Sequence, residues 1–120
     1  MSLLEEGYEL IITIVGKGWA DRVVKVGNEA GARGATILHA RGSGLHNIVS
    51  FLGIAIEPEK ELVLNVVPHD KSEAIVQAIY EATDMNEPGT GISMVIPIRG
   101  VAGLIKMPKK WQPKDKSKKL

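Results

Sequence analysis

Two short glycine-rich segments are the parts of this sequence best suited to hold an anion. They are Gly42-Ser43-Gly44 and Gly89-Thr90-Gly91. Glycine lets successive backbone N–H groups point together and approach a phosphate closely, as they do in anion-binding nests. Neither segment has the Gly-Lys-Ser/Thr ending of a Walker loop or the third glycine of a dinucleotide fingerprint. A tight turn without a ligand is the alternative interpretation of both segments.

The other residue types that carry chemistry form weaker patterns. No two of the histidines, His39, His46 and His69, have the spacing of an HxxxH pair. Cysteine is absent, which excludes disulfides, thiolate catalysis and Cys-based zinc sites. Surface or half-buried histidines are therefore favoured over metal ligands, and Ser43 and Ser50 lack the sequence of a nucleophile elbow. We expect no catalytic residues, no metal site and no enzyme activity.

Apolar periodicity predicts the elements that must position the glycine segments. Strands are expected over residues 8–15, 35–40, 62–67 and 92–98. Helical spacing predicts one helix over residues 19–30, ended by Gly31 in a left-handed cap, and a second over residues 70–83. Asp70 and Glu73 have the spacing of a capping box at the start of the second helix. Residues 45–52 fit a short helix, residues 51–56 fit a strand equally well, and residues 58–60 are expected to form a turn.

An internal repeat supports the order β-α-β-β-α-β. At an offset of 52, residues 9–15 align with residues 61–67, and the helical segments that follow align as well. The predicted fold class is therefore α+β, a ferredoxin-like split βαβ fold with an antiparallel four-stranded sheet. Both helices would cover one face of the sheet, and we expect Thr13, Asn65 and Ser93 to lie among apolar residues on the bare face. A face of this kind usually packs on a partner, so self-association is predicted.

Length and composition fit one soluble domain. The chain has 120 residues, of which 44% are apolar and 24% charged. The aromatic residues, 4% of the chain, are too few for a base-stacking platform, so no specific nucleic-acid binding is expected. The N-terminus lacks the basic start of a signal peptide, and no apolar run approaches the roughly 20 residues of a membrane span. We expect a cytoplasmic protein without membrane insertion.

The formal net charge of +1 conceals two parts of opposite charge. Residues 106–120 carry seven Lys and one Asp, whereas residues 1–105 carry eight Lys or Arg and thirteen Asp or Glu. We therefore predict a folded domain over residues 1–105 and a basic C-terminal tail over residues 106–120. The tail fits a disordered segment, a segment that captures an acidic partner, or one that docks on the acidic body of a neighbouring subunit.

Three stretches of the sequence together carry a family resemblance. They are His39-Ala-Arg-Gly-Ser-Gly44, Ile54-Ala-Ile-Glu-Pro-Glu-Lys-Glu-Leu-Val-Leu-Asn-Val-Val-Pro68 and Pro88-Gly-Thr-Gly91. In motifs and element order the chain resembles the P-II family of nitrogen-regulatory signal proteins over about residues 8–105, and is most similar to a divergent P-II-like branch with a shortened mobile loop. The resemblance implies a homotrimer with inward-facing sheets and nucleotide-binding clefts between subunits.

The resemblance also implies roles for particular residues. In the family the two glycine segments wrap the phosphates, which implicates Gly42, Ser43, Gly44, Gly89, Thr90 and Gly91 here. Ile14, Thr36 and Val66 match positions that line the adenine pocket. The loop over about residues 43–57 matches the segment that contacts a target protein.

This chain departs from the family pattern at its cations. Ile92 stands where P-II proteins have a lysine after the glycine loop, and the family's arginines near the last strand fall on Gly103 and Ile105, although Lys106 is close by. Each lost charge-assisted bond to a β- or γ-phosphate would be worth about 1.5–3 kcal/mol, which favours AMP or ADP over ATP. The loop also has no tyrosine to accept a uridylyl group, and His46 occupies its glutamine position.

The combined interpretation is a non-enzymatic signal-transduction regulator in nitrogen or carbon metabolism. It would bind an adenine nucleotide as an effector, with no tightly bound cofactor, and would control an enzyme or transporter through residues 43–57. A divalent-metal-ion-binding trimer of the ion-tolerance type is the alternative, and it requires His39, His46 or His69 to converge. A small enzyme that uses the cleft between subunits is a third hypothesis.

Overall fold

The chain folds as a four-stranded antiparallel sheet with two helices. The computed structural model describes residues 3–42, 49–51, 54–56 and 58–104. The elements in chain order are β1 (Tyr8–Gly16), α1 (Ala20–Glu29), β2 (Thr36–Arg41), β3 (Val49–Phe51), β4 (Ile54–Ile56), β5 (Glu59–Pro68), the 3₁₀ turn η1 (His69–Lys71), α2 (Ser72–Ala82) and β6 (Gly91–Pro97). This order confirms the predicted ferredoxin-like fold.

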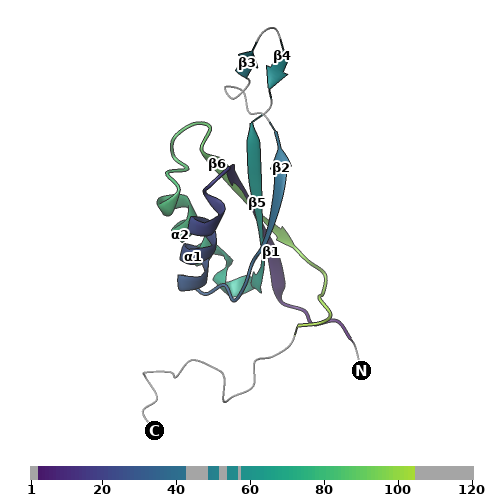
Figure 1. Ribbon diagram of the computed structural model, residues 1–120. Helices are drawn as coiled ribbons and strands as arrows, with labels where there is room; N and C mark the ends of the chain where they lie inside the picture. The colour runs from purple at the N-terminus through teal and green to yellow at the C-terminus, as the bar shows by residue number, and fades with distance from the viewer. Residues whose placement is uncertain (1–2, 43–48, 52–53, 57, 105–120) are drawn as a thin grey trace.

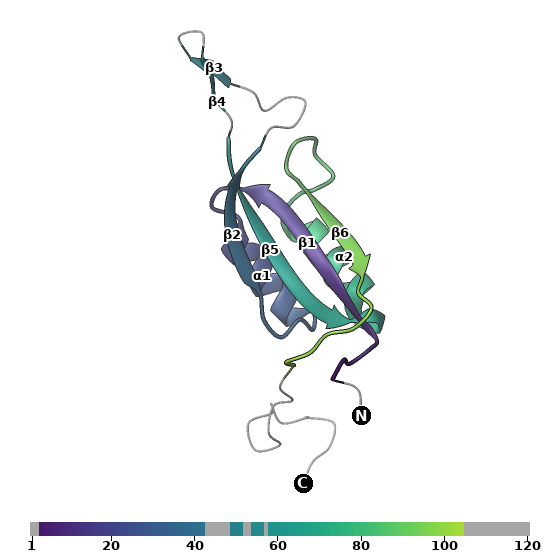
Figure 2. The same cartoon turned by 90° about the vertical axis from the view of Figure 1, so that its right-hand side faces the viewer.

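The sheet has the strand order β2-β5-β1-β6, with every neighbouring pair antiparallel. Both helices pack on one face, and the opposite face of the sheet is open in the single chain (Figures 1 and 2). A separate two-stranded hairpin, β3-β4, lies beyond the ends of β2 and β5 that border residues 42–58 (Figure 1). Of the two expectations for this region, a short helix over residues 45–52 and a strand over residues 51–56, the strand is confirmed where the chain is described, at residues 51 and 54–56.

The core lies between the sheet and the helices. It consists of the fully or almost fully buried side chains of Ile11, Val15, Ala20, Val23, Ala32, Val63, Val67, Ile75 and Ile79. Ile11 and Val15 of β1 and Val63 and Val67 of β5 lie on the same face of the sheet, because side chains alternate between the two faces of a strand. Gly31 ends α1 as predicted, with φ +125°, while the Ala32 amide bonds the Gly27 carbonyl at 2.9 Å and the Gly31 amide bonds the Asn28 carbonyl at 3.2 Å. These bonds form a Schellman motif.

The predicted capping box at the second helix is wrong. Asp70 lies in η1, α2 begins two residues later at Ser72, and neither helix start has a side-chain cap from its own N-cap residue. Instead, a glutamate on a strand accepts hydrogen bonds from residues at the start of each helix. The Glu61 carboxylate accepts bonds from the backbone amides of Gly18 and Ala20 at 2.6 and 3.2 Å, and the Glu9 carboxylate accepts a bond from Ser72 Oγ at 2.7 Å.

Two boundaries also differ from expectation. Residues 58–60 were expected to form a turn, but β5 already begins at Glu59, because Lys60 and Glu59 pair with Ala40 and Arg41 of β2. After β6 the chain returns beside its N-terminal segment. The Glu5 amide bonds the Val101 carbonyl at 2.8 Å and the Val101 amide bonds the Glu5 carbonyl at 2.9 Å. The predicted tail over residues 106–120 lies outside the described residues.

The open face is more apolar than expected, because Thr13, Asn65 and Ser93 do not lie on it. Thr13 and Asn65 are buried on the helix side, where Thr13 bonds Ser93 Oγ at 2.9 Å and Asn65 Nδ2 donates to the Gly34 carbonyl at 2.7 Å. On that side Thr13 and Ser93 bond each other and Asn65 Nδ2 has a partner, which offsets the cost of burying these groups, whereas Asn65 Oδ1 is buried without a hydrogen-bond partner.

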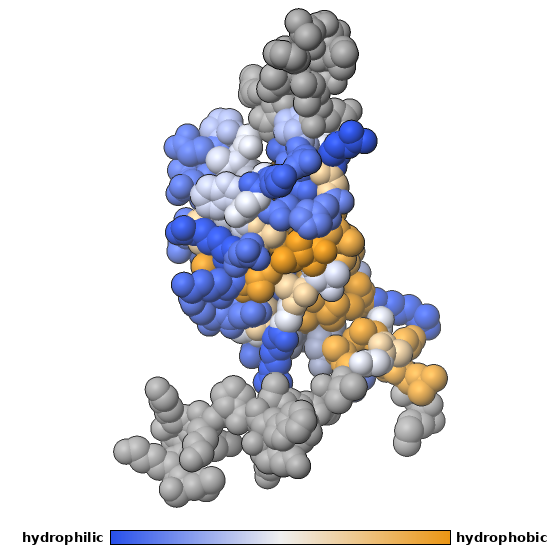
Figure 3. Space-filling model, in the orientation of Figure 1, coloured by the Kyte–Doolittle hydropathy of each residue, from blue (hydrophilic) through white to orange (hydrophobic). Residues whose placement is uncertain are grey.

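The open face itself consists of three cross-strand rows. They are Thr36-Leu64-Ile12-Met94, Leu38-Leu62-Ile14-Ile92 and Val66-Leu10-Ile96. Several of these side chains are exposed in the single chain, Leu38 by 45% and Ile92 by 54%. Figure 3 shows apolar residues gathered toward the side of the molecule that carries this face, whereas much of the helical side is hydrophilic.

Candidate functional site

The glycine segment before β6 is a tightly bonded turn. Thr90 Oγ1 lies 2.9 Å from both the Asp84 and the Glu87 carbonyl oxygens, to which it can donate, and Gly89 has φ +82°. Gly91 pairs with Val15, and a Cβ on it would stand 2.7 Å from the carbonyl oxygen of Ile14. The absence of a side chain at Gly91 is therefore required by packing against β1, whatever else this segment binds.

The glycine segment after β2 is described only at its first residue. The Gly42 amide donates to the Pro58 carbonyl at 3.2 Å, which joins the two chain segments that lead into residues 43–57. A Cβ on Gly42 would lie 4.0 Å from Cγ of Lys60, so a cationic side chain runs beside this turn. Ser43, Gly44 and Lys106 lie outside the described residues.

The three positions expected to line an adenine pocket all lie on the open face, but not together. Ile14 pairs with Leu62 and is next to the start of β6, close to the 89–91 turn. Val66 lies four residues beyond Leu62 on β5, which is about 13 Å along the strand. Thr36 pairs with Leu64, and both Thr36 and Val66 line a cavity at that far end. Within one chain, Ile14 and the neighbouring 89–91 turn therefore lie apart from Thr36 and Val66.

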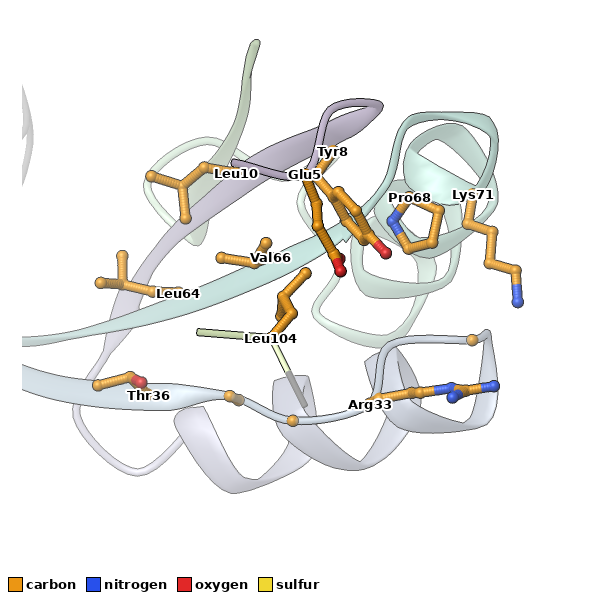
Figure 4. Close-up of a pocket in the computed structure, with 13 residues that line it drawn as sticks. Glu5, Tyr8, Leu10, Arg33, Thr36, Leu64, Val66, Pro68, Lys71 and Leu104 are labelled. Carbon is orange, nitrogen blue, oxygen red and sulfur yellow. The ribbon is translucent and has the colours of Figure 1, made fainter. Parts of the chain in front are cut away.

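The cavity at the Thr36 end has a volume of about 680 Å³. Apolar side chains of β1 and β5 form one end of it, and Arg33 and Lys71 extend at the other end (Figure 4). Leu104 also lines it, so residues after β6 contribute a wall. No local motif in the sequence marks Leu104 or the two cations, Arg33 and Lys71, which are carried by two separate connections.

A second, smaller hollow of about 420 Å³ lies at the other end of β2 and β5. It is lined by Lys17, His39, Ala40, Arg41, Glu59 and Lys60. Lys17 Nζ lies 2.7 Å from a carboxylate oxygen of Glu59, and this hydrogen-bonded pairing raises the pKa of Lys17 and lowers the pKa of Glu59. Both groups are exposed, so this pair contributes little to stability.

Among the carboxylates that the structure describes, Glu61 has the most complete set of partners. The backbone amide of Ala20 has the largest effect in lowering its pKa, burial opposes this effect, and the Gly18 amide and His39 lower the pKa further. His39 Nδ1 stands 3.8 Å from the other Glu61 oxygen. Glu61 therefore acts as a structural anion at the start of α1 rather than as a free acid or base.

A metal site receives no support from the described part of the chain. His39 lies opposite Glu61 near the beginning of β5, whereas His69 follows the end of β5 and bonds the Gly7 carbonyl at 3.2 Å through Nδ1. No group of three His, Cys, Asp or Glu side chains among the described residues is arranged to hold a metal ion. His46 lies outside those residues. None of the helices in the described ranges is long and apolar enough to cross a membrane.

A family model and two solved structures similar to this chain all concern P-II proteins. A family model described as nitrogen regulatory protein P-II matches residues 8–104. The crystal structure of Arabidopsis thaliana PII bound to citrate superposes with a TM-score of 0.61 at 23% identity, covering 79% of this chain and 80% of that chain. CPII, a nitrogen regulatory PII-like protein from Thiomonas intermedia K12 whose structure holds ADP, AMP and bicarbonate, gives 0.64 at 17% identity, covering 85% of this chain and 99% of that chain. Among curated proteins no match was found. At these identities the two structures establish a shared fold.

Proposed function

The chain belongs to the nitrogen regulatory protein P-II family, and on this premise we propose that it is a non-enzymatic regulator that binds AMP or ADP between copies of itself. Family membership makes it a signalling protein, and the ligand, assembly and target are the parts proposed here. The occurrence of ADP and AMP in the CPII structure supports the choice of ligand.

The observation that carries the proposal is the division of the expected site within one chain. Ile14 and the 89–91 turn lie at one end of the open face, and Thr36 and Val66 lie at the other. Three copies with their open faces turned inward would bring the first group of one copy next to the second group of its neighbour. Such an assembly would also cover most side chains of the apolar rows, which a solitary chain leaves in water, while those that line the cavity at the Thr36 end would remain at the cleft between copies.

The charges near the phosphate end favour a nucleotide with few phosphates. Ile92 follows the 89–91 turn and is 54% exposed, so no cation projects from this position toward a bound phosphate. Lys60 beside Gly42 would supply attraction, together with backbone N–H groups of the glycine segments other than those of Gly42 and Thr90, which are bonded to carbonyl oxygens of this chain. Lys106 is a further candidate from the tail.

The hairpin position suggests how binding would reach a target. Gly42 and Pro58 close the base of residues 43–57, and β3-β4 stands beyond this base (Figure 2). A phosphate held at Gly42 would change the arrangement of this segment, and with it the contact to an enzyme or transporter of nitrogen or carbon metabolism. We infer that the protein performs this role in the cytoplasm.

Calorimetry with AMP, ADP and ATP, together with light scattering, tests the proposal. We expect a mass three times 13.0 kDa and binding in which ATP is no tighter than ADP. Gly89→Asp should abolish binding, because it places a carboxylate against the phosphates, whereas Glu6→Asp, which keeps its charge at an exposed N-terminal position, should bind normally. Absence of heat and of thermal shift with all three nucleotides would remove the nucleotide from the proposal.

A further inference from the structure

The cavity of about 680 Å³ at the Thr36 end has two chemically different halves. Leu10, Leu64 and Val66 present aliphatic side chains from the open face. Arg33 and Lys71 reach the opposite end of the same cavity, beyond Pro68 (Figure 4). A cavity with an aliphatic half and a cationic half matches a ligand that is itself amphipathic and anionic.

Both cations are carried by short, well-bonded connections. Lys71 lies in η1, and its Cδ is 3.3 Å from where a Cβ on Gly31 would stand, so its side chain runs closely over the Schellman turn. Arg33 follows that turn directly, and the next carbonyl, that of Gly34, is bonded by the buried Asn65 Nδ2 at 2.7 Å. The backbone that presents Arg33 is thus tied to the core of the sheet.

The two cations are also electrostatically available. Neither Arg33 nor Lys71 forms an ion pair with any residue in the described ranges. Glu5 is the single acidic side chain lining the cavity, so two positive charges face one negative charge. Residues 1–105 as a whole carry more acidic than basic side chains, which makes this end of the cavity a local positive region.

We propose that this cavity binds an organic oxyanion with an apolar body, its carboxylate or phosphate held by Arg33 and Lys71 and its body packed on Leu10, Leu64 and Val66. Charged groups bonded to an oxyanion give the strong, charge-assisted class of hydrogen bonds. The aliphatic half gains from each methylene that it removes from water.

The inference does not depend on nucleotide binding at the glycine segments. Thr36 and Val66 are shared by this cavity and by the proposed adenine surface, so an organic anion and AMP are expected to compete. Competition of this kind would let the protein respond to a second metabolite class.

Titration of the full chain with hexanoate, hexyl phosphate, acetate and hexylamine tests the proposal. We expect both hexyl anions to bind, acetate to bind more weakly by about fourfold per missing methylene, and hexylamine not to bind. The relative affinity of the two anions tells whether a carboxylate or a phosphate is the preferred head group. The double variant Arg33→Gln, Lys71→Gln should weaken the hexyl anions by roughly tenfold or more.

Matched variants keep this result separate from the proposed function. Lys25→Gln removes an exposed cation from α1 that does not line the cavity, and it should leave hexanoate binding unchanged. Gly89→Asp should abolish AMP binding yet retain hexanoate binding. Failure of both hexyl anions to bind, or equal binding by the double variant and the parent chain, overturns the inference, whether or not AMP binds.

Discussion

Glu61 on β5 and Glu9 on β1 occupy equivalent positions of the two halves, and each serves the helix that follows the other strand. Glu61 accepts bonds from Gly18 and Ala20 at the start of α1, and Glu9 accepts a bond from Ser72 at the start of α2. The two halves of the repeat are therefore interlocked, because each strand satisfies polar groups of the opposite half.

Glu61→Gln should destabilise the protein by about 1–2 kcal/mol at neutral pH, since it removes the charged acceptor at the start of α1. The folded state lowers the pKa of Glu61 below 4.5, so the folded protein binds fewer protons there than the unfolded chain. This contribution is present above pH 4.5 and is lost as the pH falls through the lower, folded pKa. Urea unfolding of both proteins between neutral pH and pH 3 measures it.

The difference between Glu61→Gln and the parent chain should shrink in acid. Glu6→Gln, at an exposed position with no hydrogen bond given by the structure, is the matched control and should change stability little. A stability difference that stays constant down to pH 3 would contradict the role of the Glu61 charge.

Gly91→Ala should destabilise the fold by about 1–3 kcal/mol, because the new methyl group would overlap the carbonyl oxygen of Ile14. That oxygen would stand 2.7 Å from the added Cβ, and backbone cannot rotate aside as a side chain can. Gly34→Ala is the control, since nothing lies within 4 Å of a Cβ there. Thermal unfolding of the two variants should separate them clearly, and equal melting temperatures would show that β1 and β6 can move apart at little cost.

Leu38→Asp should prevent self-association while leaving the chain folded. Leu38 is 45% exposed in the single chain, but the proposed assembly would bury it beside Leu62, where an unpaired carboxylate costs several kcal/mol or shifts to its neutral form. Tyr80→Asp is the control, because Tyr80 is equally exposed on α2, on the helical side. Light scattering and circular dichroism distinguish loss of assembly from loss of folding, and an assembled Leu38→Asp protein would exclude the open face as the interface.

Ile92→Lys should raise the affinity for ATP by roughly tenfold and the affinity for AMP much less, because it places a cation after the 89–91 turn, where the outer phosphates are proposed to lie. Ile92→Gln adds polarity without charge and should produce no such gain. Calorimetry provides the measurement, on variants that light scattering shows to have the same assembly mass as the parent protein. An equal gain for AMP and ATP would show that the phosphates do not point toward this position.

The repeat in the sequence was sufficient to predict the sheet and its two covering helices. Apolar strands over residues 9–15 and 61–67 leave few alternatives once two amphipathic helices follow them. The predicted capping box failed because η1 delays the start of α2, where the hydroxyl of Ser72 donates to the carboxylate of Glu9 on β1. A local motif competes with long-range partners that no short window of sequence contains.

Only part of the candidate site could be predicted, because its residues come from segments that are distant in the sequence. Thr36 and Val66 line one cavity and Ile14 does not, so the adenine pocket that the resemblance implies stays a prediction, whereas no sequence motif marks Arg33 and Lys71 because they come from two connections far apart in the chain. Thr13 and Asn65 were assigned to the bare face on polarity alone. The structure buries them on the helix side, where Ser93 and Gly34 supply partners.

The sequence by itself determined the fold class and family resemblance, because periodicity, glycine positions and the repeat depend only on the order of residues along the chain. Only the tertiary structure decided which strand face each polar residue shares, which end of the sheet each site residue occupies, and which charges meet in a cavity. These properties depend on strand register, and register is set by packing and pairing between segments that are distant in sequence.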